Sequence, residues 1–383
     1  MKRSSLHTLL IGSAMALAIA ACQPAANEPA AEPAAAAATA VTITDLRDRS
    51  VTLPAPGAKI SIDDGRYLVA LALIHPDPVS VLAAWSGDAN RLGAETHAAY
   101  VAKFPALKDL PVTPSSAAEF LVEPVLAAAP GAAVVSTGAG PSDAQIAQLE
   151  GAGIPVVYID FFTHPFQNQA KSLEILGQLT GRTEQAAAYN AFRQAKLDLI
   201  ASRVKDIPED KRPTVFMEAH AGNGPDCCNS PGKGNMGDYI TFVGGHNIGA
   251  DAMDTAFGKL NLEFVIDRDP NIYIATGGPH LEKAGGFVVG EKYDVATSAA
   301  SLKKVASRRG ISTLKAVREG RTHGLSHQLI NSPIDIVATE VLAKWIHPEL
   351  FADLDPQATL NEINTKYLAV PYPGTYWVDL PKN

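Results

Sequence analysis

The centre of the chain reads TEQAAAYNAFRQAKLDLIASRVK from Thr183 to Lys205, and these 23 residues contain no glycine or proline. Thr183 suits a helix N-cap, Glu184 suits the positive end of the helix dipole, and Pro208 follows the far end. Apolar side chains recur at helical spacing and predict one buried stripe: Ala188, Phe192, Ala195 and Leu199. We therefore predict one helix over residues 183–205, roughly 34 Å long at about 1.5 Å per residue.

Short apolar runs alternate with helical stretches on both sides of this central helix. Before it, the expected strands are Lys59–Ile62, Val79–Trp85, Ala132–Ser136 and Val156–Asp160. After it, they are Thr214–Glu218, Asn271–Thr276 and Phe287–Val289. Such alternation predicts mostly parallel sheets covered by helices on both faces. The predicted fold class is α/β, with two Rossmann-like lobes, 41–182 and 206–383, joined by one long α-helix over 183–205. A single large α/β domain with an ordinary long helix is the alternative.

One unit of sequence occurs at corresponding places in the two halves. Glu123 stands seven residues before Pro130, Glu263 stands seven residues before Pro270, and an apolar strand follows each proline. Each unit has the pattern of a short helix with a carboxylate in its first turn, where the dipole favours negative charge, ended by proline. We expect the two acids to be exposed at matching corners of the lobes. Ordinary solvated first-turn acids are the alternative.

The first 40 residues have the pattern of a targeting segment and a tether. Lys2 and Arg3 precede the apolar run Leu9–Ala20, which is too short to span a bilayer but suits a signal peptide. The sequence IAAC at Ile19–Cys22 resembles a bacterial lipobox, in which the cysteine is lipidated; an ordinary cleavage site is the alternative. We predict a signal peptide over 1–21 and an Ala/Pro-rich tether over 22–40 that begins at lipidated Cys22.

The composition excludes several classes of protein. The chain has 383 residues, 46% of them hydrophobic, so disorder over most of its length is excluded. Its formal net charge of −8 argues against nucleic-acid binding, which depends on Lys and Arg meeting phosphate. No acid/base, P-loop, nucleophile-elbow or zinc-protease motif occurs. We therefore expect a protein that is not an enzyme.

Taken together, these motifs resemble the periplasmic iron-siderophore and cobalamin substrate-binding proteins of ABC importers. The resemblance covers about residues 41–370 and is carried by VTITDLRDRSVTLP at 41–54, the Glu123–Pro130 and Glu263–Pro270 units, TGRTEQAAAY at 180–189, GGHNIGAD at Gly244–Asp251 and IATGGP at Ile274–Pro279. The resemblance implies a class III periplasmic binding fold. It also implies that Glu123 and Glu263 dock onto arginines of the membrane permease.

The function that the resemblance implies is capture and delivery of a metal chelate. We expect a monomeric periplasmic lipoprotein, held on a membrane by its lipid anchor, that passes a ferric siderophore to an ABC permease and its ATPase. The bound ligand would be a ferric chelate, and no cofactor of its own is expected. Cobalamin, heme, a nickel complex or an oxyanion is the alternative cargo. A periplasmic enzyme or metal-delivery protein is the rival from another class.

The ligand is expected in a cleft at the carboxyl ends of the strands. The loops after the strands supply the candidate cleft residues Asp64, Arg66, Trp85, Thr137, Phe161, Phe162, His220, Thr276, His280 and His327. Trp85 could stack on a flat ligand or be a core aromatic, and Arg66 could pair with an anion. The three histidines could ligate, hydrogen-bond or simply be solvated, so the metal ligands remain unassigned.

The loop Gly222–Gly237 carries adjacent Cys227 and Cys228 and follows a predicted strand at its cleft end. Outside the cytoplasm, two neighbouring cysteines tend to oxidise. We therefore expect a disulfide between them that stiffens a ligand loop and include both in the cleft. A reduced thiol pair that binds a soft metal and a purely structural role are the alternatives.

Overall fold

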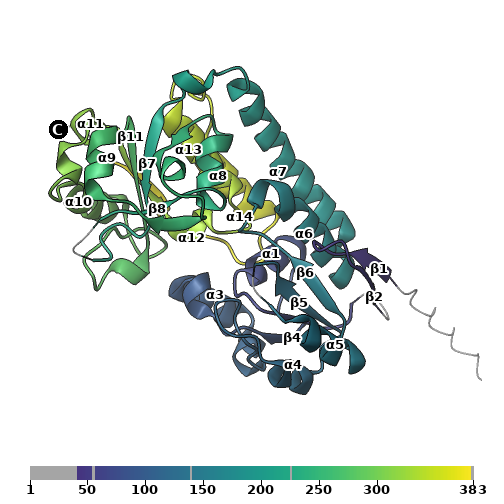
Figure 1. Ribbon diagram of the computed structural model, residues 1–383. Coiled ribbons are helices and arrows are strands. Elements are labelled where there is room, and N and C mark those ends of the chain that lie inside the picture. The colour runs from purple at the N-terminus through teal and green to yellow at the C-terminus, as the bar shows by residue number, and fades with distance from the viewer. Residues whose placement is uncertain (1–40, 54–56, 139, 225–226, 381–383) are drawn as a thin grey trace, which may run out of the picture. The chain divides into compact units, whose positions relative to one another are not determined.

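The structure is a computed structural model that describes residues 41–53, 57–138, 140–224 and 227–380 (Figure 1). The described residues belong to one compact unit. The predicted signal peptide, lipidated Cys22 and tether lie outside the described residues. Within the described part of the chain, no helix is both long and apolar enough to cross a membrane.

The first lobe is built on a parallel sheet of four strands in the order β4-β3-β5-β6. The strands are β3 (Ile60–Ile62), β4 (Leu82–Trp85), β5 (Ala132–Ser136) and β6 (Val156–Ile159). Neighbouring residues of β5 enter different cores, because Val134 packs with one face of the sheet while Ala133 and Val135 pack with the other. Helices cover the two faces: α1 (Tyr67–Ile74) and α6 (Pro165–Thr180) on one, and α4 (Val122–Ala128) and α5 (Asp143–Gly151) on the other. Before this sheet in the sequence, β1 (Val41–Thr44) and β2 (Ser50–Leu53) form an antiparallel hairpin.

The second lobe is built on a sheet in the order β9-β7-β11-β12-β13, which is parallel except for its last strand. The strands are β7 (Thr214–Glu218), β9 (His246–Asn247), β11 (Ile272–Gly277), β12 (Thr322–Ser326) and β13 (Trp377–Asp379). Its main helices are α8 (Met236–Phe242), α9 (Leu262–Arg268), α10 (Val295–Ala306), α13 (Ile336–Ile346) and α14 (Pro356–Lys366). Two α/β lobes are therefore present, as predicted.

The two lobes repeat one topology. In each, the first strand lies between the second and the third, and the fourth lies beyond the third: β4-β3-β5-β6 and β9-β7-β11-β12. The short helices α4 and α9 are each seven residues long and end at a left-handed residue, Ala129 and Asp269 respectively. A proline and a central strand follow each helix. The repeated unit of sequence is thus a repeated unit of structure.

The long helix α7 (Thr183–Val204) joins the lobes and packs against helices of both, α1 and α6 on one side and α13 on the other (Figure 1). Its bounds agree with the prediction to one residue, but the predicted apolar stripe is wrong, because Ala188, Ala195 and Leu199 are exposed. The buried face is Ala186, Tyr189, Arg193, Leu197, Ile200 and Val204. It contains a charged residue, which a count of apolar positions overlooks.

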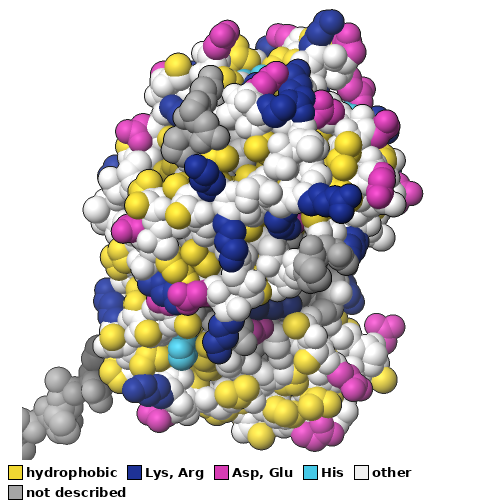
Figure 2. Space-filling model, turned by 90° about the vertical axis from the view of Figure 1, so that its left-hand side faces the viewer, with side chains coloured by type: hydrophobic (Ala, Val, Ile, Leu, Met, Phe, Trp, Pro, Cys, Tyr) yellow, Lys and Arg dark blue, Asp and Glu magenta, His cyan; other side chains and the backbone are white. Residues whose placement is uncertain are grey.

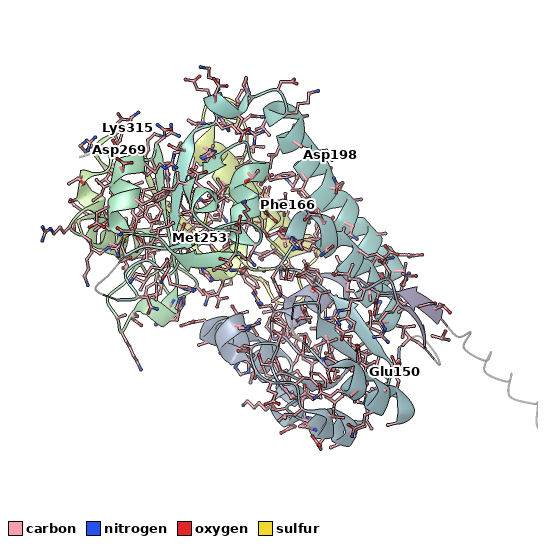
Figure 3. All side chains as sticks on the ribbon, in the orientation of Figure 1. Glu150, Phe166, Asp198, Met253, Asp269 and Lys315 are labelled. Carbon is pink, nitrogen blue, oxygen red and sulfur yellow. A yellow bond between two sulfur atoms is a disulfide. The ribbon has the colours of Figure 1, made fainter. Side chains whose placement is uncertain are left out.

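Arg193 lies on this buried face because its charge is paired with that of Asp335. Its Nε and Nη2 donate to Asp335 just before α13, over 2.9 and 2.8 Å, and the hydroxyl of Tyr239 in α8 donates to the same carboxylate over 2.8 Å. Phe166, at the start of α6, packs against Tyr239 and stacks on Phe242 at a ring distance of 4.2 Å (Figure 3). One buried ion pair thereby connects α7 to the second lobe, beside an aromatic contact between the lobes.

One predicted strand is wrong. Phe287–Val289 is buried but belongs to no strand, and the fourth parallel strand is Thr322–Ser326 instead. The ring of Phe287 lies against Gly324 of that strand so closely that a Cβ there would overlap it. Phe287 therefore packs onto the sheet, and its backbone N–H donates to the carbonyl of Ala221 in a loop rather than to a strand.

Candidate functional site

A cavity of about 650 Å³ lies between the carboxyl ends of the two sheets. The first lobe contributes Arg66 and Arg91, and the second contributes His220, His280, His327, Gln328 and Asn331. These residues follow strands β3, β4, β7, β11 and β12, at the sheet edge where open α/β folds bind ligands. The volume is that of a site for a small organic ligand or chelate.

Hydrogen bonds also join the two lobes directly. The hydroxyl of Thr96 donates to Glu291 over 2.6 Å. The backbone N–H of Asn235 donates to the carbonyl of Thr163 over 3.0 Å. The two lobes are therefore connected by polar contacts in addition to the long helix.

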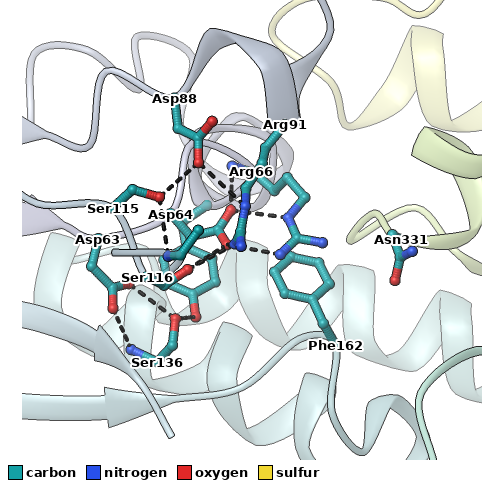
Figure 4. Close-up of polar contacts among 12 residues, drawn as sticks. Asp63, Asp64, Arg66, Asp88, Arg91, Ser115, Ser116, Ser136, Phe162 and Asn331 are labelled. Atoms are coloured by element: carbon teal, nitrogen blue, oxygen red, sulfur yellow. Dashed lines mark hydrogen bonds and ion pairs between the residues drawn. The ribbon is translucent and has the colours of Figure 1, made fainter. Parts of the chain in front are cut away.

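Two arginines and one buried aspartate make up the wall from the first lobe (Figure 4). The Nε and Nη2 of Arg66 donate to Asp64 over 2.9 and 2.8 Å, and Nη1 of Arg91 donates to the same carboxylate and to the hydroxyl of Ser116. The guanidinium of Arg66 also lies 3.4 Å from the ring centre of Phe162. Although burial raises the pKa of Asp64, the two guanidinium groups lower it to about 2. Asp64 is therefore a charged anchor that fixes the directions of both arginines.

Asp63 lies beside this anchor but has the opposite electrostatic environment. Its carboxylate accepts from the backbone N–H of Ser136 over 2.8 Å and from the hydroxyl of the same residue over 3.1 Å. Burial raises the pKa of Asp63 to about 7, with a further contribution from the charge of Asp64. Asp63 thus joins β3 to β5 beneath the cavity wall.

Three histidines form the wall from the second lobe. Nδ1 of His220 and Nε2 of His280 share a hydrogen bond of 2.8 Å, and the rings of His220 and His327 lie 3.8 Å apart. Thr276 and Asn331 contact the two ring nitrogens of His327, each over 3.1 Å. Burial lowers the pKa of all three, that of His220 to about 4. At neutral pH this wall is uncharged and presents imidazole nitrogens.

These histidines are not by themselves a ready cation site. Among the described residues, no group of three or more His, Cys, Asp or Glu side chains is arranged to hold a metal ion. The walls offer hydrogen-bond donors, imidazole nitrogens and an aromatic-backed guanidinium. That chemistry suits a ligand that accepts hydrogen bonds.

The structure brings most of the predicted cleft residues together. Arg66, His220, His280 and His327 line the cavity, Asp64 and Phe162 support Arg66, and Thr276 supports His327. Arg91 and Asn331 are lining residues that the sequence analysis missed. Asp88 stands three residues before Arg91 as Asp64 stands two residues before Arg66, but acids also precede Arg49 and Arg268, so this spacing alone does not mark the site.

Three predicted cleft residues lie elsewhere. Trp85 is 4% exposed and stacks on His97 in the core, and Phe161 is 1% exposed and packs beside Tyr67. The carbonyl of Thr137 accepts from Arg47, a residue of the N-terminal hairpin turn. The apolar character of the two aromatic side chains places them in the core, although each follows a strand.

The cysteines also lie away from the cleft cavity. The sulfur atoms of Cys227 and Cys228 are paired in the structure, and Cys228 is fully buried in the core of the second lobe. Cys227 lines a separate cavity of about 480 Å³ with residues such as Leu260 and Arg308. The loop turns away from the cleft because β8 (Asn229–Pro231) pairs with β10 (Phe257–Lys259).

A larger cavity, of about 810 Å³, lies at the opposite end of β12. It is lined by residues that include Arg321, His323, Trp345 and Trp377. His323 stacks on Trp345, and its Nδ1 is hydrogen-bonded to Asp379 over 2.6 Å, so this nitrogen is already used within the lobe. Because this is the amino end of a parallel strand, it is not where such sheets bind ligands.

Glu123 and Glu263 occupy matching positions. Each is exposed and lies in the first turn of its helix, α4 or α9, in the repeated unit. The two acids do not face each other in one core, because α4 and α9 cover different sheets.

Both the sequence and the fold of this chain match those of known proteins. A family model described as periplasmic binding protein matches residues 71–328. The chain belongs to this family. Among solved structures, the TroA-like periplasmic binding protein FepB from Veillonella parvula is 28% identical, with a TM-score of 0.79 over 89% of this chain and 100% of its own.

Other proteins that this chain resembles are less similar in sequence. MolA of Haemophilus influenzae, bound to molybdate, is 18% identical over 87% of this chain and 99% of its own, with a TM-score of 0.65, which shows a shared fold. The Bacillus subtilis protein YvrC, an uncharacterized ABC transporter substrate-binding lipoprotein, is 24% identical over 210 residues. That match spans 54% of this chain and 59% of the length of YvrC.

Proposed function

We propose that this protein is the substrate-binding lipoprotein of an ABC importer and that its cargo is a ferric siderophore. The observation that carries the proposal is the cavity between the sheets, with an arginine wall from one lobe and a histidine wall from the other. A ligand held there contacts both lobes at once. Its capture requires no bond to be made or broken, and no cofactor is involved.

The two walls have different roles in this proposal. Arg66 and Arg91 donate to oxygen atoms of the chelate, and the ring of Phe162 fixes the guanidinium of Arg66 from behind. The imidazoles of His220 and His280 contact the opposite side of the cargo. Because Asp64 holds both arginines, their donors are preorganised before the ligand arrives.

Delivery depends on the outer corners of the molecule. We propose that Glu123 and Glu263 dock onto arginines of the permease, whose ATPase drives import, and that the lobes are 41–182 and 206–383 with 183–205 between them. Exposed carboxylates at equivalent positions of two equivalent lobes suit a partner with two equivalent faces. The proposed anchor at Cys22 keeps this monomer at a membrane in the periplasm.

The proposal is tested by titrating the purified protein with candidate cargoes and following tryptophan fluorescence. Ferric siderophores, cobalamin, heme, molybdate and a nickel chelate form the panel, and saturable binding of a ferric siderophore at about micromolar Kd or tighter is expected. Saturation by another cargo instead would keep the protein in its class and change its ligand. Failure of every cargo to bind, or turnover of a substrate, would overturn the proposal.

The rival that uses the cysteine loop has less support. Cys228 is fully buried, and Cys227 faces a different cavity from the one between the lobes. Binding of a bare soft metal that is abolished by Cys227→Ser would favour that rival.

A further inference from the structure

The charges of the arginine wall already compensate one another. Asp64 accepts from Arg66 and from Arg91, and a carboxylate oxygen of Asp88 lies 3.2 Å from Nε of Arg91. Two guanidinium groups therefore face two carboxylates, and their formal charges sum to zero. A bound anion would not meet an unpaired positive charge on this wall.

The histidine wall adds no charge either. Burial lowers the pKa of His220 to about 4 and also lowers the pKa of His280, so both rings are neutral at pH 7. His327 has its pKa lowered by burial, by its two neighbouring histidines and by the charge of Arg66. Among the described residues that line the cavity, neither wall supplies a net positive charge.

What the walls do supply is hydrogen-bond donors. Nη1 of Arg66 and Nη2 of Arg91 have no partner among the described residues, although the other nitrogens of both groups are used. Such donors can bind chelate oxygens without neutralising a large ligand charge. On the outer face shown in Figure 2, Lys and Arg side chains are more numerous than Asp and Glu side chains across the middle. The charge balance of the two walls concerns the lining of the cavity and not this outer face.

Two classes of ferric chelate differ in net charge. Three hydroxamate groups carry one negative charge each and neutralise Fe(III), whereas three catecholate groups carry two each and leave a trianion. Moving a multiply charged ion out of water is costly unless the site provides compensating charges. A cavity with balanced walls offers a trianion hydrogen bonds but little compensation.

Resting on the proposed function, we propose that the cavity selects metal chelates of low net charge, of the ferric trihydroxamate type, over highly anionic chelates of the ferric tricatecholate type. Asp64 and Asp88 are the residues that determine this selectivity, because they cancel the charge of the two arginines. Their contact is with the arginines, and their effect on the cargo is electrostatic.

The test is calorimetric titration of the full chain, purified in detergent, with one ferric trihydroxamate and one ferric tricatecholate. The neutral complex is expected to bind roughly tenfold more tightly or better. Equal or tighter binding of the tricatecholate would overturn the selectivity while leaving the proposed function intact. If neither ferric complex binds, the proposed function itself fails.

A charge variant makes the test specific. Asp88→Asn leaves the buried Asp64 anchor in place and gives the arginine wall one net positive charge, so the preference for the neutral chelate should fall by about threefold or more. Asp198→Asn makes the same change of charge on the exposed side of α7, where the Asp198 carboxylate accepts a hydrogen bond from Gln194 (Figure 3). That control should leave the preference unchanged. An unchanged preference in Asp88→Asn would contradict the role given to the aspartates.

Discussion

The two lobes share a backbone plan and differ at the edge that faces the ligand. Both have the same order of four parallel strands and the same helix–proline–strand unit. At the cleft, however, one lobe presents arginines held by aspartate, and the other presents a cluster of neutral histidines. A repeated scaffold therefore fixes where the two walls stand, while the loops after the strands decide independently what each wall binds.

The largest effect is expected from removing the two exposed glutamates that occupy equivalent positions in the two lobes. The double variant Glu123→Ala, Glu263→Ala should abolish uptake of the cargo, because both proposed contacts with the permease are lost. Cargo affinity should be unchanged, since both residues lie outside the cavity. Transport assays in cells and titration of the purified protein measure the two quantities. Normal transport by the double variant would refute the docking role.

The next largest effect is expected from breaking the buried ion pair that connects α7 to the second lobe. Arg193→Met leaves Asp335 buried without its partner and should lower the free energy of unfolding by about 3–5 kcal/mol. Urea denaturation measures this loss. The matched control is Arg203→Met, which removes a more exposed pair with Asp353 at the end of the same helix and should cost less than about 1 kcal/mol. Equal losses in the two variants would show that the buried pair is not the stronger connection.

The comparison of the two walls is sharpened by one substitution in each. Arg66→Ala and His220→Ala should each weaken binding of the cargo by about tenfold, because each removes a polar contact in a confined site. Isothermal titration gives the two Kd values. His246→Ala and Arg268→Ala serve as controls, since both side chains contact Asp251 away from the cavity. A loss confined to one wall would mean that the cargo rests on a single lobe.

Asp63, beneath the arginine wall, and His220, in the histidine wall, should make the stability of the protein respond to pH in opposite directions. The pKa of Asp63 is raised to about 7 in the folded protein, so its buried carboxyl favours folding most below its ordinary value of about 3.9 and loses that contribution as pH rises towards 7. The pKa of His220 is lowered to about 4, so its contribution is complete above about 6.5 and is lost as pH falls towards 4.

Variants separate these two contributions. Relative to the unchanged protein, Asp63→Asn should gain stability as pH is raised from 4 to 8, and His220→Asn should gain stability as pH is lowered from 7 to 4. Thermal unfolding across this pH range measures both trends. Parallel trends in the two variants would contradict the assigned environments.

The smallest effect is expected at the disulfide, which has no counterpart in the first lobe among the described residues. Cys227→Ser should leave the Kd of the cargo unchanged, because Cys227 lines a different cavity. Titration under the conditions used for the wall variants is sufficient. A clear loss of affinity would return this loop to the ligand site.

Much of the scaffold could be predicted from the sequence because its signals are local. The helix α7, the strands β5 and β7, and the repeated helix–proline unit follow from uninterrupted helical spacing, apolar runs and proline positions. The buried face of α7 could not be predicted, because Arg193 is buried through a partner 142 positions away. The strand β12 was missed because its sequence, THGLS, contains glycine and histidine and has no apolar run.

The site was predictable by residue type but not by arrangement. The ends of the predicted strands indicated Arg66 and the three histidines, and the structure places these four side chains on the cavity at the sheet edge. That His220 and His280 share a hydrogen bond, or that Asp64 holds two arginines, depends on distances between loops far apart in sequence. Trp85 and Phe161 follow strands too, and only tertiary packing shows that they belong to the core.

The central claim is that the cargo metal sits between the two walls. Anomalous diffraction at the iron edge, from crystals of the protein grown with a ferric trihydroxamate, locates that metal directly. The account predicts one iron peak inside the cavity bounded by Arg66 and His220. A peak at the cavity beside Cys227, or at the one beside Trp345, would contradict it.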